Sequence, residues 1–312
     1  MTKAHPQGPA SGPPLLLVHG AMLLSSFLVA TSFPVGKAIT PFLDPTLLTL
    51  IRFVLATLIF APQVFGKNRA VTSWPGPRRL MQYSLIGATL AGFFVLLFFA
   101  LRTTTPFNTG ILYTTVPGLA ALYSWLLVGE RLQRLRVLAI VPAMAGAIWV
   151  IAEGDLYRLL HLQMHSGDLL FAAGCLLMAL YMPLVKIFHR GEPMVQMTFW
   201  VLATGSCWLV PAVLLQQPVV EWEAVPLRVW VGIGYLTVFT TNITFFLTQW
   251  ATIHLGPTRV TAYAYLYPPY ILLIEWCLHG SIPSVHALLG VLLILPSMFL
   301  MQRSAYQERK RG

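Results

Sequence analysis

The sequence predicts an all-α polytopic membrane protein, built from ten transmembrane helices arranged as two inverted five-helix repeats. Composition is the first observation: 57% of the 312 residues are hydrophobic, 10% are charged, and the mean hydropathy is +0.72. Soluble domains are about 25% charged. The second observation is a series of ten long apolar segments, and the third is a weak internal repeat. The composition excludes disordered proteins, nucleic-acid binders and most soluble enzymes.

The ten apolar segments lie between polar and Pro/Gly breaks. Each approaches the roughly 20 residues that a helix needs to cross a bilayer core of about 30 Å. The expected helices cover residues 15–37, 45–61, 80–101, 107–128, 135–152, 167–188, 194–215, 227–253, 258–279 and 285–302. The connecting loops are too short to hold a soluble domain. The first segment is too long for a cleaved signal peptide and lacks an A-x-A site.

The distribution of Lys and Arg predicts the orientation. The formal net charge is +10, from 20 Lys and Arg against 10 Asp and Glu. With the N-terminus in the cytoplasm, 15 basic residues lie in inner segments, 4 lie in outer segments and Arg52 lies within a span. Cytoplasmic loops of membrane proteins collect Lys and Arg. We therefore expect a multi-pass protein of the bacterial inner membrane, with both termini in the cytoplasm and lipid, not nucleic acid, as its partner.

A weak repeat divides the chain into two halves. Pro34-x-x-Lys37 matches Pro183-x-x-Lys186 at an offset of 149, and "VLAT" occurs at both 54–57 and 201–204. Two further proline pairs match at an offset of 151: Pro106 with Pro257, and Pro117 with Pro268. Matches in order and at nearly constant offset favour a duplicated five-helix unit. Because five is odd, the second copy must be inverted in the membrane, which is typical of transporters.

These features predict five regions along the chain. The expected regions are a cytoplasmic tail 1–14, a first repeat 15–152, a periplasmic linker 153–166, a second repeat 167–302 and a basic cytoplasmic tail 303–312.

Four stretches resemble the EamA family of the drug/metabolite transporter superfamily. They read "TSFPVGKAI" from residue 31, "PTLLTLIRFVLATLIF" from 45, "VPGLAALYSWLLVGERL" from 116 and "GDLLFAAGCLLMALYMPLVK" from 167. The resemblance covers about 15–302. It implies a central cavity, lined mainly by the first, third, fourth, sixth, eighth and ninth helices, and secondary transport of small metabolites, often export of amino acids or related compounds. One departure is that Gly280-Ser281 stands where a second copy of Gly129-Glu130 is expected.

Two charged residues within spans are candidates for gating or coupling. Arg52 is the only basic residue well inside a span, where a charge costs at least about 2.5–3.5 kcal/mol. It is either an anion anchor or gate, or a structural residue that bonds loop carbonyls. Glu275 is the only acid that we place within a span, and Asp168 is expected to cap the 167–188 helix. Glu275 is either a proton-coupling group or an interfacial carboxylate, and an Arg52–Glu275 gating pair is geometrically feasible.

Polar faces mark the expected cavity wall. In the 227–253 helix, Thr237, Thr241, Thr244 and Thr248 follow steps of 4, 3 and 4 and share one face, beside Asn242 and Gln249. In the 107–128 helix, Asn108 and Thr115 have the same seven-residue spacing as Asn242 and Gln249, with Tyr113 nearby. The alternative is structural, because such side chains also bond their own backbone or a neighbouring helix.

Aromatic residues form a second expected surface. In the 258–279 helix, Tyr263, Tyr267 and Tyr270 share a face with Tyr265 opposite, and Trp250 joins them from the 227–253 helix. Such a wall packs an apolar or aromatic solute, although belt and core packing is the alternative. Pro268-Pro269, Pro34, Pro117 and Pro183 are expected to break or kink helices that face the cavity.

Lys37 and Lys186 occupy matching places in the repeats, as solute-attracting groups or snorkelling anchors. The predicted solute-contacting residues are therefore Asn108, Tyr113, Thr115, Tyr181, Thr241, Asn242, Gln249, Trp250, Tyr263 and Tyr267, and the predicted gating or coupling residues are Arg52, Glu275, Lys37 and Lys186.

The sequence predicts no enzymatic activity, no cofactor and no metal site, since Walker A, H-E-x-x-H and G-x-S-x-G motifs do not occur in it. The leading hypothesis is a secondary transporter that moves a small metabolite by alternating access, with a proton as a candidate coupling ion. A polytopic membrane enzyme and a non-transporting membrane scaffold are the alternatives. Solute identity, direction and oligomeric state stay open.

Overall fold

A computed structural model describes residues 14–66, 74–129, 134–151, 166–255, 257–280 and 284–311, and these residues form helices and short connections without a strand. The first half contains α1 (Leu15–Ile39), α2 (Pro45–Phe65), α3 (Pro77–Thr103), α4 (Pro106–Tyr113), α5 (Val116–Val128) and α6 (Arg134–Ile151). The second contains α8 (Ser166–Phe188), α9 (Met194–Gln216), η1 (Trp222–Ala224), α10 (Leu227–Thr237), η2 (Val238–Ile243), α11 (Thr244–Leu255), α12 (Pro257–Thr261), η3 (Ala262–Leu266), α13 (Tyr267–His279) and α14 (Val285–Arg311).

Seven stretches among the described residues are long and apolar enough to cross a membrane. They are Leu15–Ile39, Pro45–Phe65, Pro77–Thr103, Pro106–Leu127, Ser166–Phe188, Met194–Gln216 and Leu227–Thr252. The protein is therefore an all-helical, multi-pass membrane protein. Of the other three expected segments, 135–152 and 285–302 overlap α6 and α14, and 258–279 is divided into α12, η3 and α13.

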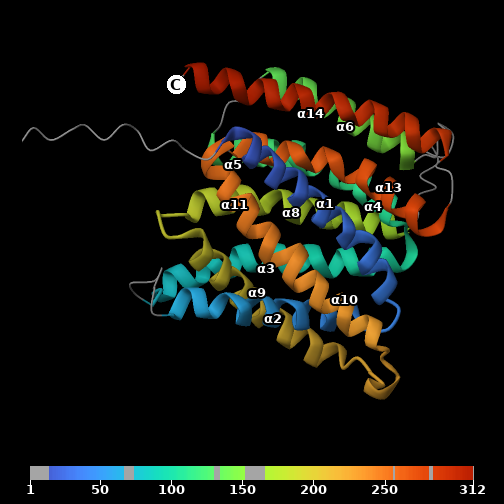
Figure 1. The fold of residues 1–312 in the computed structure, drawn as a ribbon. Coiled ribbons are helices and arrows are strands. Elements are labelled where there is room, and N and C mark those ends of the chain that lie inside the picture. The colour runs from blue at the N-terminus through green and yellow to red at the C-terminus, as the bar shows by residue number, and fades with distance from the viewer. Residues whose placement is uncertain are drawn as a thin grey trace, which may run out of the picture.

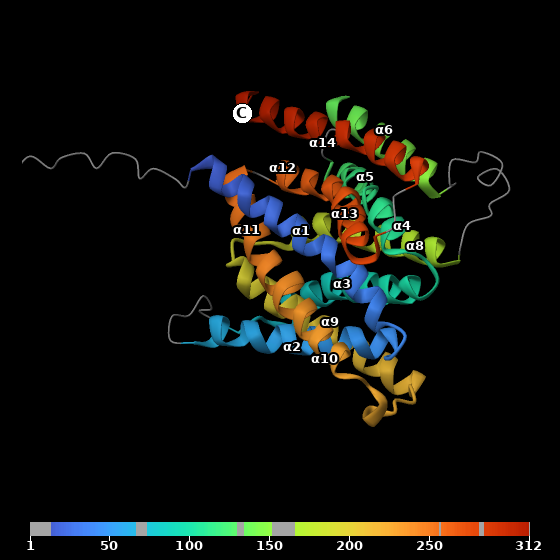
Figure 2. The ribbon, with the colours of Figure 1, turned by 45° about the vertical axis from the view of Figure 1, so that its right-hand side comes forward.

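The helices of the two halves interleave. α3 packs against α8 and α9, and α2 also packs against α9. Conversely, α1 packs against α10, α11 and α13, while α2 contacts α10. The pair α6 and α14 lies side by side along one edge of the bundle, with α2 and α9 at the opposite edge (Figures 1 and 2). Each half therefore buries its first helices against the third helix of the other half.

Local chemistry sets several helix boundaries. The Asp44 carboxylate accepts hydrogen bonds from the backbone N–H groups of Thr46 and Leu47, at 2.8 and 3.3 Å, and caps α2 ahead of Pro45. Gly129 and Gly280 end α5 and α13 with φ of 73° and 65°, a left-handed conformation that glycine adopts without strain. The departure from the family pattern at Ser281 therefore leaves the helix-ending glycine in place.

The predicted proline breaks occur in only two of the four helices. Pro117 and Pro268 lie in the first turns of α5 and α13, after α4 and η3 have ended. Pro34 and Pro183 lie inside continuous α1 and α8. α1 and α8 therefore run through their prolines without a break, although each proline removes one backbone hydrogen bond. The expected kinks in these two helices stay a prediction.

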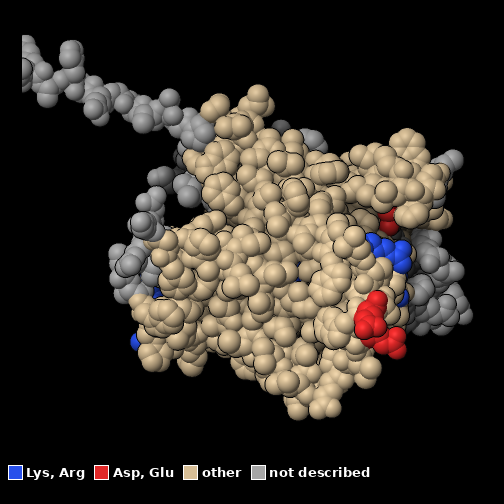
Figure 3. Space-filling model, turned by 60° about the horizontal axis from the view of Figure 1, so that its bottom comes forward, with Lys and Arg blue, Asp and Glu red and all other residues tan. Residues whose placement is uncertain are grey.

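One face of the bundle is almost free of charge. Figure 3 shows a broad surface without Lys, Arg, Asp or Glu between charged groups at its edges. The start of α1 and the C-terminal end of α14 lie at the same end of the bundle (Figures 1 and 2). An apolar belt between two charged ends is what a lipid-facing surface requires.

Candidate functional site

A buried arginine occupies the contact between α2 and η2. Arg52 is 2% exposed, and its guanidinium donates from Nε to the Thr241 hydroxyl at 3.0 Å and from Nη2 to the Thr240 and Thr241 hydroxyls at 3.0 and 2.8 Å. The Phe94 ring from α3 covers the guanidinium, with 4.3 Å from Cζ to the ring centroid. Arg52 thus bonds threonines of the other half, and the alternative that it bonds loop carbonyls is wrong.

The π-helix η2 brings both threonines to Arg52. The hydroxyls of Thr240 and Thr241 each donate to the Leu236 carbonyl, at 2.8 and 3.0 Å, so Thr241 reaches back five residues instead of four. π-turns inside α-helices occur frequently at functional sites. The widened turn also adds Thr240, which the expected face of Thr237, Thr241, Thr244 and Thr248 does not include, to the partners of Arg52.

Asn242 follows in the same π-helix. It is 9% exposed, and both its Nδ2 and its Oδ1 are buried without a hydrogen-bond partner. The Nη1 atom of Arg52 is buried without a partner as well. Buried polar atoms in native proteins are normally satisfied. The contact between α2 and η2 therefore holds unpaired hydrogen-bonding capacity that includes a cation.

An aromatic cluster fills the centre of the bundle, where helices of both halves meet. The rings of Tyr113 and Tyr267 lie 5.2 Å apart between centroids, and Phe33 lies 6.3 Å from Tyr113 and 6.4 Å from Tyr267. Phe93 is 5.9 Å from Tyr113, and Phe171 is 6.0 Å from Phe93. The five rings come from α1, α3, α4, α8 and α13. We call these five residues the central aromatic cluster.

Two other predicted residues border the central aromatic cluster. Tyr181 lies close enough to Tyr113 for the two hydroxyl groups to interact electrostatically. Thr115 lies at the break between α4 and α5 and donates its hydroxyl to the Leu112 carbonyl at 2.7 Å. Asn108 is half-buried in the first turn of α4, and its backbone N–H is bonded to Thr105. Because α4 ends at Tyr113, Asn108 and Thr115 do not share one continuous helix.

A separate cluster contains Tyr263 and Trp250. The Tyr263 hydroxyl shares a hydrogen bond with His19 Nδ1 of α1, and the Trp250 ring lies 5.1 Å from the His254 ring. Residues 262–266 form a 3-10 helix, and Tyr263, Tyr267 and Tyr270 contact His19, Phe33 and Phe27 of α1 in turn. Tyr267 belongs to the centre and Tyr263 to the cluster with α1. Tyr265, expected on the opposite face, is fully buried.

Lys37 and Lys186 have different surroundings. The Lys37 ammonium donates to the carbonyls of Arg102 and Thr104, at 3.3 and 3.0 Å, and so ties α1 to the end of α3. This arrangement fits an anchor that leaves the apolar region to reach polar atoms. Lys186 is exposed near the end of α8. The Gln249 side chain lies outside the part of the chain that the structure describes.

The two acids near helix ends differ in burial. Glu275 is half-buried in α13, one turn before His279. Asp168 is 1% exposed, and its Oδ1 accepts a hydrogen bond from the Thr104 hydroxyl. Asp168 therefore joins α8 to the end of α3. Describing Glu275 as the only acid within a span is wrong, because Asp168 lies inside the Ser166–Phe188 span.

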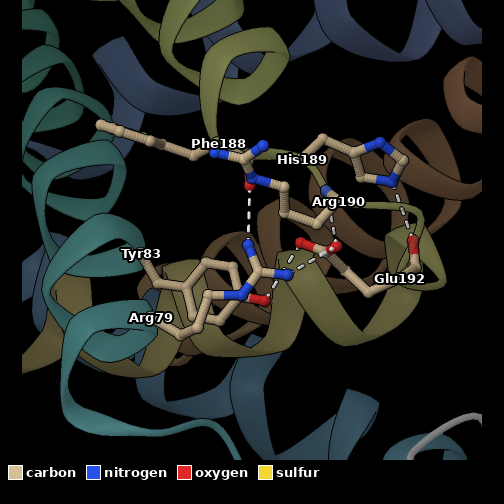
Figure 4. Close-up of polar contacts among 6 residues, drawn as sticks. All are labelled: Arg79, Tyr83, Phe188, His189, Arg190 and Glu192. Atoms are coloured by element: carbon tan, nitrogen blue, oxygen red, sulfur yellow. Dashed lines mark hydrogen bonds and ion pairs between the residues drawn. The ribbon is translucent and has the colours of Figure 1, made fainter.

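Arg52 and Glu275, whose pairing is geometrically feasible from the sequence, form no ion pair in the structure. A different ion pair is present among the described residues: it joins Arg79 of α3 to Glu192, with 3.1 Å from Nη2 to Oε2. Arg79 Nη1 also donates to the Phe188 carbonyl at 2.8 Å, the Tyr83 hydroxyl donates to Glu192 Oε1 at 3.1 Å, and the backbone N–H of Arg190 donates to Oε2 at 2.8 Å (Figure 4). Sequence reasoning missed this cluster because no local spacing links residues so far apart.

These bonds determine the ionisation of Glu192, which lies between α8 and α9. Burial alone would raise the pKa of its carboxyl group. The backbone N–H groups of Glu192 and Arg190, the Tyr83 hydroxyl and the positive charge of Arg79 outweigh burial, so the pKa lies below its ordinary value. The carboxylate is therefore the form that the fold favours.

Two hollows of about 460 and 250 Å³ lie along α3 and α9. The larger is lined by Leu80, Met81, Ser84, Trp200, Ala203, Thr204 and Cys207. Neither is lined by Arg52, Asn242 or the central aromatic cluster. Both are mainly apolar grooves that suit lipid chains more than a polar solute.

Comparison with known proteins identifies relatives over nearly the whole chain. The chain is 22% identical to the uncharacterized transporter YyaM of Bacillus subtilis, over 88% of this chain and 90% of that protein. It is 26% identical to Protein PecM of Dickeya dadantii, over 90% and 91%. It is 22% identical to a probable terminal-alkyne amino-acid exporter of Streptantibioticus cattleyicolor, over 94% and 95%.

A solved crystal structure has the same fold, with a TM-score of 0.67 at 22% identity over 93% of this chain and 98% of that one. The model of the EamA-like transporter family matches residues 16–152 and again residues 165–303. The resemblance noted in the sequence is thus confirmed, and the chain belongs to the EamA-like transporter family.

Proposed function

We propose that this membrane transporter exports a small amphipathic metabolite, an amino acid or a related compound, across the bacterial inner membrane by alternating access. The observation that carries this proposal is the central aromatic cluster, to which helices of both halves contribute rings. A site at the interface of two repeats can be exposed to either side when one repeat rocks against the other.

The proposed architecture is ten transmembrane helices in two inverted five-helix repeats, 15–152 and 167–302, with both termini in the cytoplasm. Three findings support it: the family model matches twice, the third helix of each half packs on the first two helices of the other, and both described ends of the chain lie at one end of the bundle. A chain that crosses the membrane an even number of times must have both ends on the same side.

The choice of solute class rests on chemistry near the centre. Aromatic rings pack an apolar part of a solute, while the polar atoms of Arg52 and Asn242 suit a charged or hydrogen-bonding part. One relative is named as a probable exporter of an amino acid, which agrees with this class. Solute contacts are proposed for Tyr113, Tyr181 and Tyr267 in the centre, for Asn108, Thr115, Thr241, Asn242 and Gln249, and for Trp250 and Tyr263 at the second cluster.

The experiment is a growth-protection screen with toxic amino-acid analogues, followed by counterflow of each protective compound in proteoliposomes. Export predicts that cells expressing the chain tolerate the analogue and accumulate less of it. Counterflow of chemically unchanged solute supports the transporter over a membrane enzyme or a scaffold. Protection without counterflow, or with chemical conversion of the solute, would overturn the proposal.

A further inference from the structure

The charge of Arg52 is buried without an acidic partner in the part of the chain that the structure describes. Its neighbours are the neutral hydroxyls of Thr240 and Thr241 and the Phe94 ring. These groups solvate a guanidinium but do not neutralise it. Charged side chains are almost never fully buried unless they are paired. A retained buried cation of this kind calls for an anion, and the described part of the chain does not supply one.

The unpaired atoms around Arg52 have a definite pattern. Nη1 carries two N–H donors, and Asn242 contributes the Nδ2 donor and the Oδ1 acceptor. Asn242 directly follows Thr241, the threonine that binds two guanidinium nitrogens. Arg52 Nη1 therefore offers unpaired donors that carry a positive charge, and the residue after Thr241 in η2 offers a further unpaired donor and one acceptor.

The surroundings change from polar to aromatic on moving from Arg52 toward the centre of the bundle. Phe94, which covers the guanidinium, lies 5.0 Å from Phe93, a member of the central aromatic cluster. Phe93 in turn contacts Tyr113, and Tyr113 contacts Tyr267. A row of rings thus begins at the cation and ends at α13.

We propose that Arg52 and Asn242 bind the head group of an α-amino acid, with its apolar side chain along the row of rings from Phe94 to Tyr267. The carboxylate accepts from Arg52 Nη1 and Asn242 Nδ2, and the ammonium group donates to Asn242 Oδ1. This assignment deepens, and rests on, the proposed transport of a small amphipathic metabolite. It makes Arg52 a substrate-binding residue, not half of a gating ion pair.

The test is equilibrium binding to the purified full-length chain in lipid nanodiscs, with radiolabelled L-phenylalanine as the probe. Two unlabelled compounds compete with the probe, and each of them lacks one charge of the amino-acid head group. L-phenylalaninamide lacks the carboxylate charge, and 3-phenylpropanoate lacks the ammonium group. We expect the amide to bind at least about tenfold more weakly than the acid, because it loses the charge-assisted bond to Arg52. The phenylpropanoate should lose less affinity, because it keeps the carboxylate and lacks only the bond from the ammonium group to Asn242 Oδ1.

Variants of Arg52 and Asn242 test whether these two side chains cause the preference for acid over amide. Arg52→Gln should weaken L-phenylalanine binding by about tenfold or more, and it should also abolish the preference for acid over amide. Asn242→Leu should reduce affinity for the acid while retaining part of that preference. The matched control is Arg190→Gln, which removes an exposed arginine side chain outside the helices and should leave binding unchanged.

Several results would overturn the assignment. They are equal binding of acid and amide by the wild-type chain, unchanged binding by Arg52→Gln, or no binding of L-phenylalanine, L-leucine and L-serine. The acid-amide comparison needs no variant, so it decides the question even if Arg52→Gln does not fold. Counterflow of a solute without a carboxylate would remove this assignment while leaving the transport function intact. Failure of all counterflow would remove the transport function itself.

Discussion

Arg79 and Arg228 lie 149 positions apart, and each lies near the start of the third long helix of its half. Each also reaches the loop between the first two long helices of the other half. Arg79 at the start of α3 bonds the Phe188 carbonyl and Glu192, between α8 and α9. Arg228 at the start of α10 lies over the Phe42 ring between α1 and α2, 4.7 Å from Cζ to its centroid.

The offset of 149 is the same one that relates Pro34 to Pro183 and Lys37 to Lys186. Equivalent residues thus make equivalent contacts between the halves, which supports the proposed duplication. The chemistry of the two contacts differs, because one is an ion pair with additional hydrogen bonds and the other is a cation–π contact. The two ends of the bundle are therefore held together with unequal strength.

Glu192→Gln is expected to destabilise the folded protein by about 1 kcal/mol at neutral pH, because the carboxylate loses its charge-assisted bonds. The folded-state pKa of Glu192 is depressed. Its carboxylate therefore stabilises the fold above the unfolded-state pKa of about 4.3, and this contribution is lost as pH falls through the folded-state pKa. Thermal unfolding of both proteins from pH 7 downward should show their midpoints converging in acid.

The matched control is Glu221→Gln, since Glu221 is exposed and precedes η1. Its midpoint should follow the wild-type protein at every pH. A constant difference between wild type and Glu192→Gln, independent of pH, would contradict the ionised pairing with Arg79.

Thr241→Val is expected to cost about 1–3 kcal/mol of stability, because it removes the acceptor of two Arg52 nitrogens and leaves a buried charge less solvated. The matched variant Thr244→Val removes a hydroxyl of equal size and similar burial that bonds only carbonyls of its own helix. Chemical or thermal unfolding in detergent should give a clearly smaller loss for Thr244→Val. Equal losses would mean that Arg52 does not depend on Thr241.

The sequence allowed the helices to be located because hydrophobicity and capping are local signals. The Asp44-Pro45 pair starts α2 where it was expected, and the expected span 194–215 becomes α9, Met194–Gln216. The segment expected from 80 begins instead at Pro77, because a helix start tolerates Arg78 and Arg79, which hydropathy assigns to the loop. Hydropathy therefore finds the apolar body of a helix more accurately than its ends.

The site was only partly predictable because its geometry depends on non-α turns and long-range partners. The shared face of threonines was predicted from the 3.6-residue period of an α-helix. Residues 238–243 form the wider π-helix η2, in which the Thr240 hydroxyl also bonds Arg52. At η3, which is a 3-10 helix, the sequence also gives no indication of which α1 residues Tyr263 and Tyr267 contact, namely His19 and Phe33. Arg52 and Thr241 each stand out in the sequence, but no local signal pairs two residues that lie 189 positions apart.

Reporter fusions test the orientation. A reporter fused after Arg311 should behave as cytoplasmic, and one inserted in the 153–166 linker should behave as periplasmic. The reason is the excess of Lys and Arg in the segments assigned to the cytoplasm. Alkaline phosphatase activity and green fluorescence provide opposite readouts for the two compartments. Reversed signals would refute the orientation, and matching signals at both positions would refute the five crossings in the second half.

Tyr267→Ala should raise the KM for transport by about tenfold while leaving expression intact, because it removes a ring of the central aromatic cluster, the proposed solute contact. Tyr267→Phe should stay within about twofold, because it retains the ring. The control Tyr270→Ala lies in the same helix and packs on Phe27 instead. Initial rates in proteoliposomes measure all three. An unchanged KM in Tyr267→Ala would exclude this residue from the solute site.

Glu275 and Asp168 provide the final contrast, between a proposed coupling group and a structural acid. Asp168 is buried and accepts a bond from Thr104, so Asp168→Asn should lower stability without uncoupling transport. Glu275 is half-buried near the end of α13, where a change in access could expose it alternately to each side. Glu275→Gln retains shape but cannot ionise, so it should abolish proton-driven accumulation while sparing counterflow, which needs no net proton movement.

Accumulation driven by an imposed pH gradient, measured beside counterflow in the same proteoliposomes, separates these roles. If Glu275→Gln loses both activities, Glu275 serves binding or folding. If it loses neither, Glu275 is an interfacial carboxylate, and the driving force must come from the solute gradient or another ion. Loss of accumulation in Asp168→Asn with intact stability would instead transfer the coupling role to Asp168, since that carboxylate would then be the group that titrates as access alternates.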